Sequence, residues 1–588
     1  MSDIKQLWSY ILPKRRVQFC LVLMMMILSS VVDVISLGAV IPFLGVLSSP
    51  EKVFQYEFIQ PFLIMFEIGS PSELILPFTV LFIFASIMSA LLRIVLLYSV
   101  TRLSYATGLD ISVSIFERTI YQDYKVHLAR NSSEIINSII IKTETVIGGI
   151  LLPILMTISS FLLLVGIVAT LVTVNPLITF VSFLVIASMY LFVTLFTRKK
   201  LSKIGKVVAS ESTLKIKSLQ EGLGGIRDVL VNRSQQYFVN LYKKSDVLLR
   251  RSSGTGIFIG SSPRFFMEAG VITLIAIIAY IMSQKNGGIM QIIPILGLFA
   301  LGAQRLVPAL QNIFSSYAKI TSASESLKDV LNLLNQQLPN SYSSDVVPLS
   351  FNNQIELNNA GFSYSSELPW VFRNIDIKIK KGSKIGFIGE TGCGKSTLVD
   401  TIMGLLYLNE GEILVDGEIV DQNNIDSWRA CISHVPQSIY LSDSSVEENI
   451  AFGIPIEKID HNRVQEAAKK AQIESFINQL LDGYKTVIGE RGVRFSGGQL
   501  QRLGIARALY KKADVLVFDE ATSALDNATE NDVIQSINML DSQITILIIA
   551  HRISTLKGCD QIIKIQNDGQ YIVSNYENAL IEDSKNLA

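Results

Sequence analysis

Long apolar runs separated by polar stretches dominate the first half of the chain. They lie near residues 17–48, 73–101, 145–173, 177–197, 257–283 and 287–316. An α-helix needs about 20 apolar residues to cross the hydrocarbon part of a bilayer, and each run is long enough for one crossing. The pattern predicts a six-span α-helical transmembrane domain over residues 1–325, a linker over 326–349 and a second domain over 350–588.

Basic clusters beside these runs predict the orientation of the membrane domain. Lys14, Arg15 and Arg16 precede the first run, and residues 198–200 (Arg-Lys-Lys) follow the fourth. Positively charged flanks favour the cytoplasmic side, so we expect a multi-pass protein of the cell inner membrane with the second domain in the cytoplasm. The first run is too long for the apolar part of a signal peptide, and no N-terminal processing is expected.

Composition agrees with a membrane domain joined to a soluble one. The 588 residues are 49% hydrophobic and 17% charged, and 51 basic side chains balance 51 acidic ones. A neutral chain offers no electrostatic footprint for nucleic acid, so no nucleic-acid partner is expected. The four cysteines form no metal-binding or disulfide pattern.

The strongest chemical signal is the segment GETGCGKST, which fits the phosphate-loop pattern G-x-x-x-x-G-K-[ST]. Its glycines allow successive backbone N–H groups to face phosphate oxygens. Lys395 is expected to reach the β- and γ-phosphates, and Ser396 to bind Mg²⁺. The nucleotide-binding residues predicted here are Gly389, Glu390, Thr391, Gly392, Cys393, Gly394, Lys395, Ser396 and Thr397.

A second acidic motif follows a short apolar run. Residues 515–518 (VLVF) lead into Asp519 and Glu520. Four apolar residues in a row are typical of a buried parallel strand, which would deliver Asp519 to Mg²⁺ at its carboxyl end. Glu520 would then orient or deprotonate the attacking water. The alternative is an acidic pair that only caps the strand.

With FSGGQ at residues 495–499 between these two motifs, the C-terminal part resembles the nucleotide-binding domain of ABC transporters, an α/β P-loop fold that binds ATP and Mg²⁺. The resemblance implies an adenine-stacking role for Tyr364, a metal-binding role for Gln437, and a γ-phosphate contact and catalytic role for His551 beside Glu520.

GERG at 489–492 resembles the X-loop of exporters. Phe495 stands where the family usually has Leu. Taken singly, Tyr364 and His551 could simply be packed at strand ends. The remaining nucleotide-binding residues implied are Ser496, Gly497, Gly498, Gln499 and, in the D-loop SALD, Asp526.

The FSGGQ segment also predicts assembly. Ser496 and the glycines after it would start a helix, whose N-terminus is a site for anions. In the ABC family this segment faces the phosphate loop of another nucleotide-binding domain, with ATP between them. Because the chain holds one such domain, we expect a homodimer with two equivalent ATP sites.

Two long polar stretches, 105–145 and 200–256, interrupt the apolar runs and are too long for simple turns. By resemblance to type IV exporters, spans two to five would continue as helices beyond the membrane. Short coupling helices would lie near Tyr121–Lys125 and Gly222–Asp228. Solvated amphipathic linkers are the alternative.

The segment after the first run, residues 50–72, is rich in aromatic and aliphatic side chains and poor in charge. Such a segment can lie in the outer membrane interface. It resembles the external helix of the lipid-linked oligosaccharide flippases of bacterial protein N-glycosylation. A loop packed against its own spans remains the other interpretation.

Arginines inside the apolar runs point to an anionic substrate. Arg93, Arg264 and Arg305 lie about 16 to 19 residues from the expected outer ends of their spans, so they would share one depth. Intramembrane arginines usually face a cavity, and their planar groups suit phosphate oxygens. Alternatively, these side chains reach the inner interface, with Arg264 neutralised by Glu268. Asp33 could pair across helices or serve the outward path of the substrate.

Together these features predict an ATP-driven exporter that flips a lipid-linked, anionic substrate, in particular a polyprenyl pyrophosphate oligosaccharide, across the membrane. Membrane lipid is an expected partner. A general lipid or multidrug exporter is the first alternative. A channel or regulator gated by ATP is the second, and the presence of Glu520 favours turnover over gating. A soluble ABC ATPase would not carry six spans.

Overall fold

A computed structural model describes the chain except residues 1, 49, 57–59, 61–63, 65–68, 175, 284–288, 339–345, 366, 490–494, 521–534, 536, 538–540, 567–568 and 587–588. The chain divides into two compact units. Unit 1 contains Met1–Gln122 and Arg130–Leu338, and unit 2 contains Asp123–Ala129 and Pro339–Ala588. The chain therefore passes between the units three times, after residues 122, 129 and 338.

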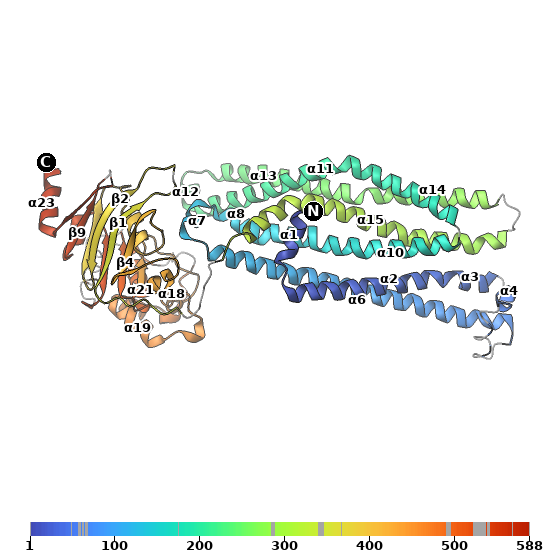
Figure 1. Cartoon of the computed structure of the whole chain (residues 1–588), viewed down its shortest axis with the longest axis horizontal. Helices are drawn as coiled ribbons and strands as arrows, with labels where there is room; N and C mark the ends of the chain where they lie inside the picture. Colours follow the sequence, from blue (N-terminus) through green and yellow to red (C-terminus); the bar gives the residue numbers. More distant parts are fainter. Residues whose placement is uncertain are drawn as a thin grey trace. The chain divides into compact units, whose positions relative to one another are not determined.

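Unit 1 is built from helices, several of them very long (Figure 1). Its main described helices are α1 (Ser2–Tyr10), α2 (Pro13–Gly38), α3 (Val40–Ser48), α4 (Pro50–Phe54), α6 (Ile75–Ile120), α8 (Ser132–Asn137), α9 (Thr143–Val146), α10 (Leu152–Val174), α11 (Pro176–Gly224), α12 (Ile226–Val231), α13 (Gln235–Ser261), α14 (Pro263–Ser283) and α15 (Ile289–Leu334).

Four helical stretches among the described residues are long and apolar enough to cross a membrane. They are Pro13–Leu47, Pro71–Ile120, Ser132–Thr173 and Thr179–Gly224, and they cover nearly all of the first four apolar runs. The other two runs fall in α13–α14 and in α15, where the side chains of residues 281–299 are not described. Helices α6 and α11, with 46 and 49 residues, continue well past their apolar runs.

Helix α15 continues to Leu334, beyond the boundary at residue 325 that the sequence predicted. Its last turns carry Leu327, Val330, Leu331 and Leu334, all of them buried. Their spacing of three and four residues puts them on one helix face. That face joins an apolar cluster with residues of α1, α6 and α10, and the burial explains why the helix does not end earlier.

The two expected coupling segments are both short helices. Near the second, α11 ends at Gly224, and α12 (Ile226–Val231) begins after Gly225. The first is α7 (Tyr124–Ala129), a few residues further along than expected, and it belongs to unit 2. There the ammonium nitrogen of Lys125 lies 5.9 Å from the ring centroid of Phe362.

The outer segment 50–72 is described only in part. Helix α4 covers its first residues, and the side chain of Val53 is buried in a small apolar cluster with Val46 and Leu74. This contact agrees with a segment packed against its neighbouring helices. The aromatic stretch on which the expectation of an external helix depends lies largely outside the described residues.

Unit 2 contains two β-sheets. A four-stranded antiparallel sheet has the order β2-β1-β4-β5, from β1 (Gln354–Phe362), β2 (Phe372–Lys380), β4 (Glu410–Val415) and β5 (Glu418–Ile419). A six-stranded sheet has the order β10-β9-β3-β8-β7-β6. It contains β3 (Lys384–Gly389), β6 (Ile432–Val435), β7 (Val515–Asp519), β8 (Thr545–Ile549), β9 (Gln561–Ile565) and β10 (Tyr571–Ser574). All neighbours in this second sheet are parallel except β9 and β10.

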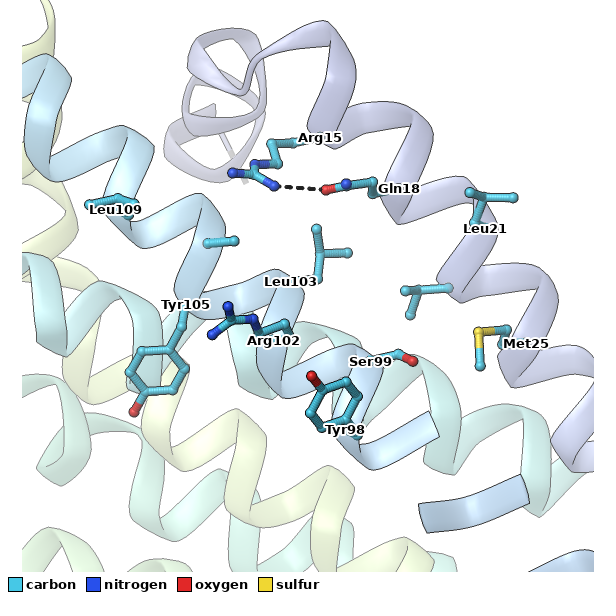
Figure 2. Close-up of a pocket in the computed structure, with 12 residues that line it drawn as sticks. Arg15, Gln18, Leu21, Met25, Tyr98, Ser99, Arg102, Leu103, Tyr105 and Leu109 are labelled. Atoms are coloured by element: carbon cyan, nitrogen blue, oxygen red, sulfur yellow. Dashed lines mark hydrogen bonds between the residues drawn. The ribbon is translucent and has the colours of Figure 1, made fainter. Parts of the chain in front are cut away.

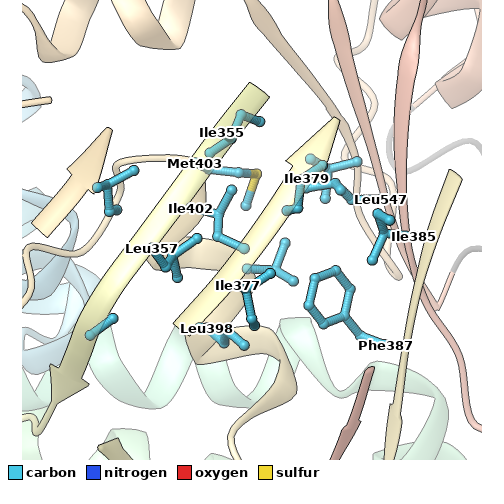
Figure 3. Close-up of a cluster of buried hydrophobic side chains, with 14 of the residues drawn as sticks. Ile355, Leu357, Ile377, Ile379, Ile385, Phe387, Leu398, Ile402, Met403 and Leu547 are labelled. Carbon is cyan, nitrogen blue, oxygen red and sulfur yellow. The ribbon is translucent and has the colours of Figure 1, made fainter. Parts of the chain in front are cut away.

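Helix α16 (Lys395–Ile402) is fixed in the core of unit 2. Its residues Leu398 and Ile402 are fully buried against β1, β2, β3 and β8 (Figure 3). Alternating residues of β7 and β8 face this cluster and a second one that includes helix α21 (Gly497–Tyr510). Strands buried on both faces explain the continuous apolar runs seen in the sequence.

Candidate nucleotide site and membrane-domain cavity

The parallel strands of unit 2 bring the predicted nucleotide-site residues to one edge of the sheet. Strand β3 leads into the phosphate loop, β7 ends at Asp519, and one residue, Ala550, separates the end of β8 from His551. In the strand register, Ile549 of β8 is paired with both Phe387 of β3 and Asp519 of β7. Because parallel strands share their carboxyl edge, residues far apart in sequence converge there.

The phosphate loop has the backbone conformation that its glycines predict. Gly392 has φ +88° and Gly394 has φ +97°, in the left-handed region where a side chain would be strained. A Cβ atom at Gly394 would also lie 2.7 Å from Cγ1 of Val371. Gly394 is the residue before α16, so the first N–H groups of this helix face the loop, as anion binding requires.

Lys395 is 4% exposed and its ammonium group lies inside the loop. Its Nζ atom donates hydrogen bonds to the carbonyl oxygens of Gly389 at 2.9 Å and Glu390 at 2.8 Å. These bonds keep the ammonium group of Lys395 against the backbone of the loop that would surround the phosphates. A phosphate oxygen can replace a carbonyl as acceptor, so the geometry suits the predicted role.

Glu520 is held by two side chains at the end of β7. Its Oε1 lies 2.5 Å from Nε2 of His551, and its Oε2 accepts a 2.6 Å hydrogen bond from Nε2 of Gln437. Glu520 has φ +47°, an uncommon conformation for a residue with a side chain. Such strain often marks functional positions. The predicted residues Glu520, His551 and Gln437 thus form one hydrogen-bonded group.

The pKa of Asp519 is raised by burial first and by the neighbouring Glu520 second, while Lys395 and His551 oppose the shift. Burial also raises the pKa of Asp400, on α16, to about 6, and Asp519 adds to that effect. Two carboxyl groups that are costly to ionise therefore lie close to the phosphate loop. A cation bound between them and the phosphates would relieve this cost.

Oxygen atoms suitable for Mg²⁺ come from Ser396, Gln437 and Asp519. Since Nε2 of Gln437 donates to Glu520, its side-chain oxygen is directed elsewhere and can act as a ligand. Among the described residues there is no group of three or more His, Cys, Asp or Glu that could hold a metal alone. The donor set fits a magnesium ion completed by phosphate oxygens and water.

Tyr364 lies beside the phosphate loop, half-buried. Its hydroxyl is 3.2 Å from Oγ1 of Thr397, and its ring packs edge-on against Phe362 with centroids 5.0 Å apart. Both the packing interpretation and a position near a bound base therefore fit. The pKa of the Tyr124 phenol, on α7, is raised by burial first and then by Asp400, Tyr364 and Asp519.

Ser496 starts α21 as the sequence predicted. Its Oγ accepts a hydrogen bond from the backbone N–H of Gln499 at 3.3 Å, and the Gln499 side chain accepts one from the backbone N–H of Ser496 at 2.8 Å. This reciprocal capping box fixes the helix N-terminus at the SGGQ segment. Asp526 and Glu490–Gly492, expected in the D-loop and X-loop, lie outside the described residues.

In unit 1, Arg93 and Arg305 come together around Asp33, although they lie on different helices. Arg93 Nε donates to both carboxylate oxygens of Asp33, at 2.8 and 2.9 Å, and Arg305 Nη1 donates to the backbone oxygen of Asp33 at 2.8 Å. All three residues line a cavity of about 500 Å³ that also contains serines, Gln304 and Asn312. Its ionisable side chains carry one net positive charge.

Arg264 does not join this group. Its Nε atom lies 2.7 Å from Oε1 of Glu268, one helical turn away, and the side chain is exposed. It is not among the residues that line the cavity. The structure therefore brings together two of the three predicted arginines. The role of Asp33 as their partner had only a weak sequence signal, namely one acidic residue in the first apolar run.

A second cavity of about 630 Å³ lies between α2 and α6, and no motif in the sequence predicted it. Figure 2 shows Tyr98 and Arg102 of α6 facing this space, opposite Arg15 and Gln18 of α2. Arg15 forms an ion pair with Asp110 at 2.7 Å. Within the described part of the chain, Arg102 has no ion-pair partner.

Comparison with known families matches both parts of the chain. The model for the ABC transporter transmembrane region matches residues 17–301, and the ABC transporter model matches residues 372–523. The fold of the chain is similar to the structure of a bacterial Atm1-family ABC exporter with ATP bound. That similarity has a TM-score of 0.78 over 97% of this chain and 96% of the other, at 21% sequence identity.

Similar proteins with higher sequence identity match a smaller part of the chain. The alpha-hemolysin translocation ATP-binding protein HlyB of Proteus vulgaris is 35% identical over 49% of this chain and 40% of its own length. The ATP-dependent lipid A-core flippase of Francisella tularensis (strain SCHU S4 / Schu 4) is 41% identical over 36% of this chain and 34% of its own. The matches thus span less than half of these relatives.

Proposed function

Because the chain belongs to the ABC transporters, a family with an ATP-binding domain and an ATPase coupled to transport, we propose that it is an ATP-driven exporter. The observation that carries this proposal is the hydrogen-bonded group of Gln437, Glu520 and His551 at the edge of the sheet that holds the phosphate loop. Glu520 would act on the attacking water, and His551 would contact the γ-phosphate. Mg²⁺, bound by Ser396, Gln437 and Asp519, would neutralise charge on the phosphates.

We propose further that the exporter is a homodimer in the inner membrane, with its nucleotide-binding domains in the cytoplasm. The hydrogen bonds of the capping box hold the start of α21 in a shape that can bind an anion. In the proposed dimer, Ser496 and the glycines of one copy would complete the ATP site of the other. ATP binding would close the two domains, and hydrolysis would reset them.

The proposed substrate is a lipid-linked anion, in particular a polyprenyl pyrophosphate oligosaccharide. Support comes from the cavity around Asp33, where Arg93 and Arg305 give a net positive charge. Guanidinium groups bind phosphate oxygens through paired hydrogen bonds. Arg264 has less support for a substrate role, because it is paired with Glu268.

A general lipid or multidrug exporter is the second candidate, and the name of the lipid A-core flippase relative makes a glycolipid an obvious alternative cargo. Reconstitution into vesicles separates these possibilities. ATP turnover and translocation are measured with a polyprenyl pyrophosphate oligosaccharide, a glycerophospholipid and a hydrophobic cation. A selective response to the first supports the proposal. Equal responses support the general exporter.

Glu520→Gln serves as the control in both measurements. In an exporter this change should remove nearly all phosphate release and all translocation. Translocation or current that persists in the variant would instead favour a channel or regulator gated by ATP. Replacing Arg93 and Arg305 together should abolish translocation of the anionic lipid, while ATP turnover without substrate stays close to that of the unmodified chain.

A further inference from the structure

Asp33 is a buried carboxylate whose two oxygens are both engaged. Its side chain is 4% exposed. It accepts hydrogen bonds from Arg93 Nε and from the hydroxyl of Ser89, and Arg93 Nη2 lies 2.8 Å from Oδ1. Isolated carboxylates are very costly in the low-dielectric interior of a membrane protein. The position of Asp33 therefore depends on Arg93 and Ser89.

The two arginines are less enclosed than the carboxylate that they share. The side chain of Arg93 is 43% exposed and that of Arg305 is 24% exposed. Arg305 binds the backbone oxygen of Asp33 and the hydroxyl of Ser36, and its Nη1 atom is 4.0 Å from Oδ1. A ligand in the cavity can therefore reach both guanidinium groups, whereas the side chain of Asp33, which also lines the cavity, is almost fully enclosed.

We propose that Asp33 is a resident counter-ion, which the anionic group of the substrate displaces from Arg93, and that it thereby limits how tightly the cavity binds that group. This inference rests on the proposed function. Without substrate, Asp33 neutralises Arg93. When a pyrophosphate enters, its oxygens compete for the same N–H donors, and the carboxylate repels them. A transporter must release its cargo. A carboxylate that competes for Arg93 weakens the binding of an anionic cargo and thereby favours its release.

The principal alternative is that the Asp33–Arg93 pair only holds α2 against α6. If the pair is only structural, loss of Asp33 should lower the stability of the protein and change the response to all substrates alike. If Asp33 is a counter-ion, its loss should change the response to charged substrates alone. The test therefore compares a polyprenyl pyrophosphate with the matching uncharged polyprenol, using the full chain in vesicles. The measurement is the lipid concentration that gives half-maximal stimulation of ATP turnover.

Asp33→Asn keeps the shape of the side chain and removes its charge. The expected result is a half-saturating concentration of polyprenyl pyrophosphate about tenfold lower than in the unmodified chain, since one repulsive charge a few ångströms away is removed in a partly hydrated cavity. The value for polyprenol should not change. Arg102→Gln is the matched control. Arg102 lies on α6, as Arg93 does, but it lines the other cavity, so its removal should leave both half-saturating concentrations unchanged.

A second comparison applies if Asp33→Asn fails to fold. Arg93→Gln and the double variant Arg93→Gln/Asp33→Asn both lack the ion pair, so its contribution to folding is absent from each. The double variant should bind polyprenyl pyrophosphate about tenfold more tightly than Arg93→Gln, with polyprenol unchanged. An equal effect on both lipids, or none on either, would overturn the role of Asp33. If the unmodified chain responds to no anionic lipid, the proposed substrate class fails, and this inference fails with it.

Discussion

Replacing His551 with alanine tests whether Glu520 is held in place for catalysis. The structure gives Glu520 two side-chain contacts, with His551 at 2.5 Å and Gln437 at 2.6 Å, and its side chain is only 13% exposed. A hydrogen bond to a charged group contributes about 1.5–3 kcal/mol. If that energy acts in the transition state, kcat for ATP should fall by about 10- to 150-fold. The KM for ATP should rise less than kcat falls, because the phosphate loop and Lys395 still bind ATP when the proposed γ-phosphate contact of His551 is lost.

The assay is steady-state ATP turnover by the purified full chain in vesicles at saturating Mg²⁺. Residues that act as a unit show non-additive effects, so His551→Ala should cause little further loss in a Glu520→Gln background. His461→Ala is the matched control. His461 forms a similar contact with Glu447, at 2.8 Å, on an exposed part of the same unit. Its removal should leave kcat unchanged.

Two results would refute this reasoning. A rise in KM without a change in kcat would mean that His551 contributes only to binding ATP. Losses that multiply in the double variant would mean that His551 and Glu520 act independently, in which case their contact does not matter for the reaction.

Three further predictions concern stability, measured as unfolding of the full chain in detergent without nucleotide. Ser496→Ala removes the capping bond of α21 and should destabilise unit 2 by about 1 kcal/mol; no change would mean that the capping box is not formed. The pKa of Asp400 is about 6 when folded, above its ordinary value of 3.8, so the folded state binds this proton more tightly. The ionised carboxylate therefore costs stability above about pH 6, and the cost disappears as the pH falls toward 4. Asp400→Asn should raise the unfolding temperature at pH 7.5 and have little effect at pH 4; a gain that is equal at both pH values would contradict the assignment. Asp329→Asn removes the negative charge 2.7 Å from the buried ammonium of Lys142 and should destabilise unit 1 by about 2 kcal/mol, less than for a fully enclosed pair because Asp329 is 40% exposed. Unchanged unfolding of that variant would show that water replaces the partner at no cost.

The local structure around the candidate nucleotide site was largely predictable, because its motifs lie on short, regular elements. Residues 515–518 predicted a buried parallel strand, and β7 is such a strand, ending at Asp519. The helix start at Ser496 followed equally from local chemistry. What the motifs could not give was the contact between Glu520 and His551, because it depends on the order of β7 and β8 in the sheet.

The membrane cavity was harder to predict, for a physical reason. In a helix that is apolar on all sides, residue counting predicts how deep a side chain lies in the membrane. It does not predict the direction in which that side chain points, because no polar face distinguishes the protein interior from lipid. Counting therefore grouped Arg264 with Arg93 and Arg305, whereas the structure pairs Arg264 with Glu268, which was the alternative that the sequence also offered. The choice of Asp33 as the partner of Arg93 depends on how α2 packs against α6. The C-terminal extension of α15 was missed because its apolar face is short and lies among polar residues.

The membership of α7 in unit 2 has a mechanical consequence. Seven residues, Asp123–Ala129, are joined by peptide bonds at both ends to unit 1, to α6 on one side and to the segment leading into α8 on the other. Tyr124 and Lys125 in this segment lie near Asp400 and Phe362, beside the phosphate loop and Tyr364. A displacement of the nucleotide-binding unit therefore acts through the backbone on the chain at both ends of this segment. A fragment that begins at residue 339 would lack Asp123–Ala129 and would expose the surface of unit 2 that α7 covers.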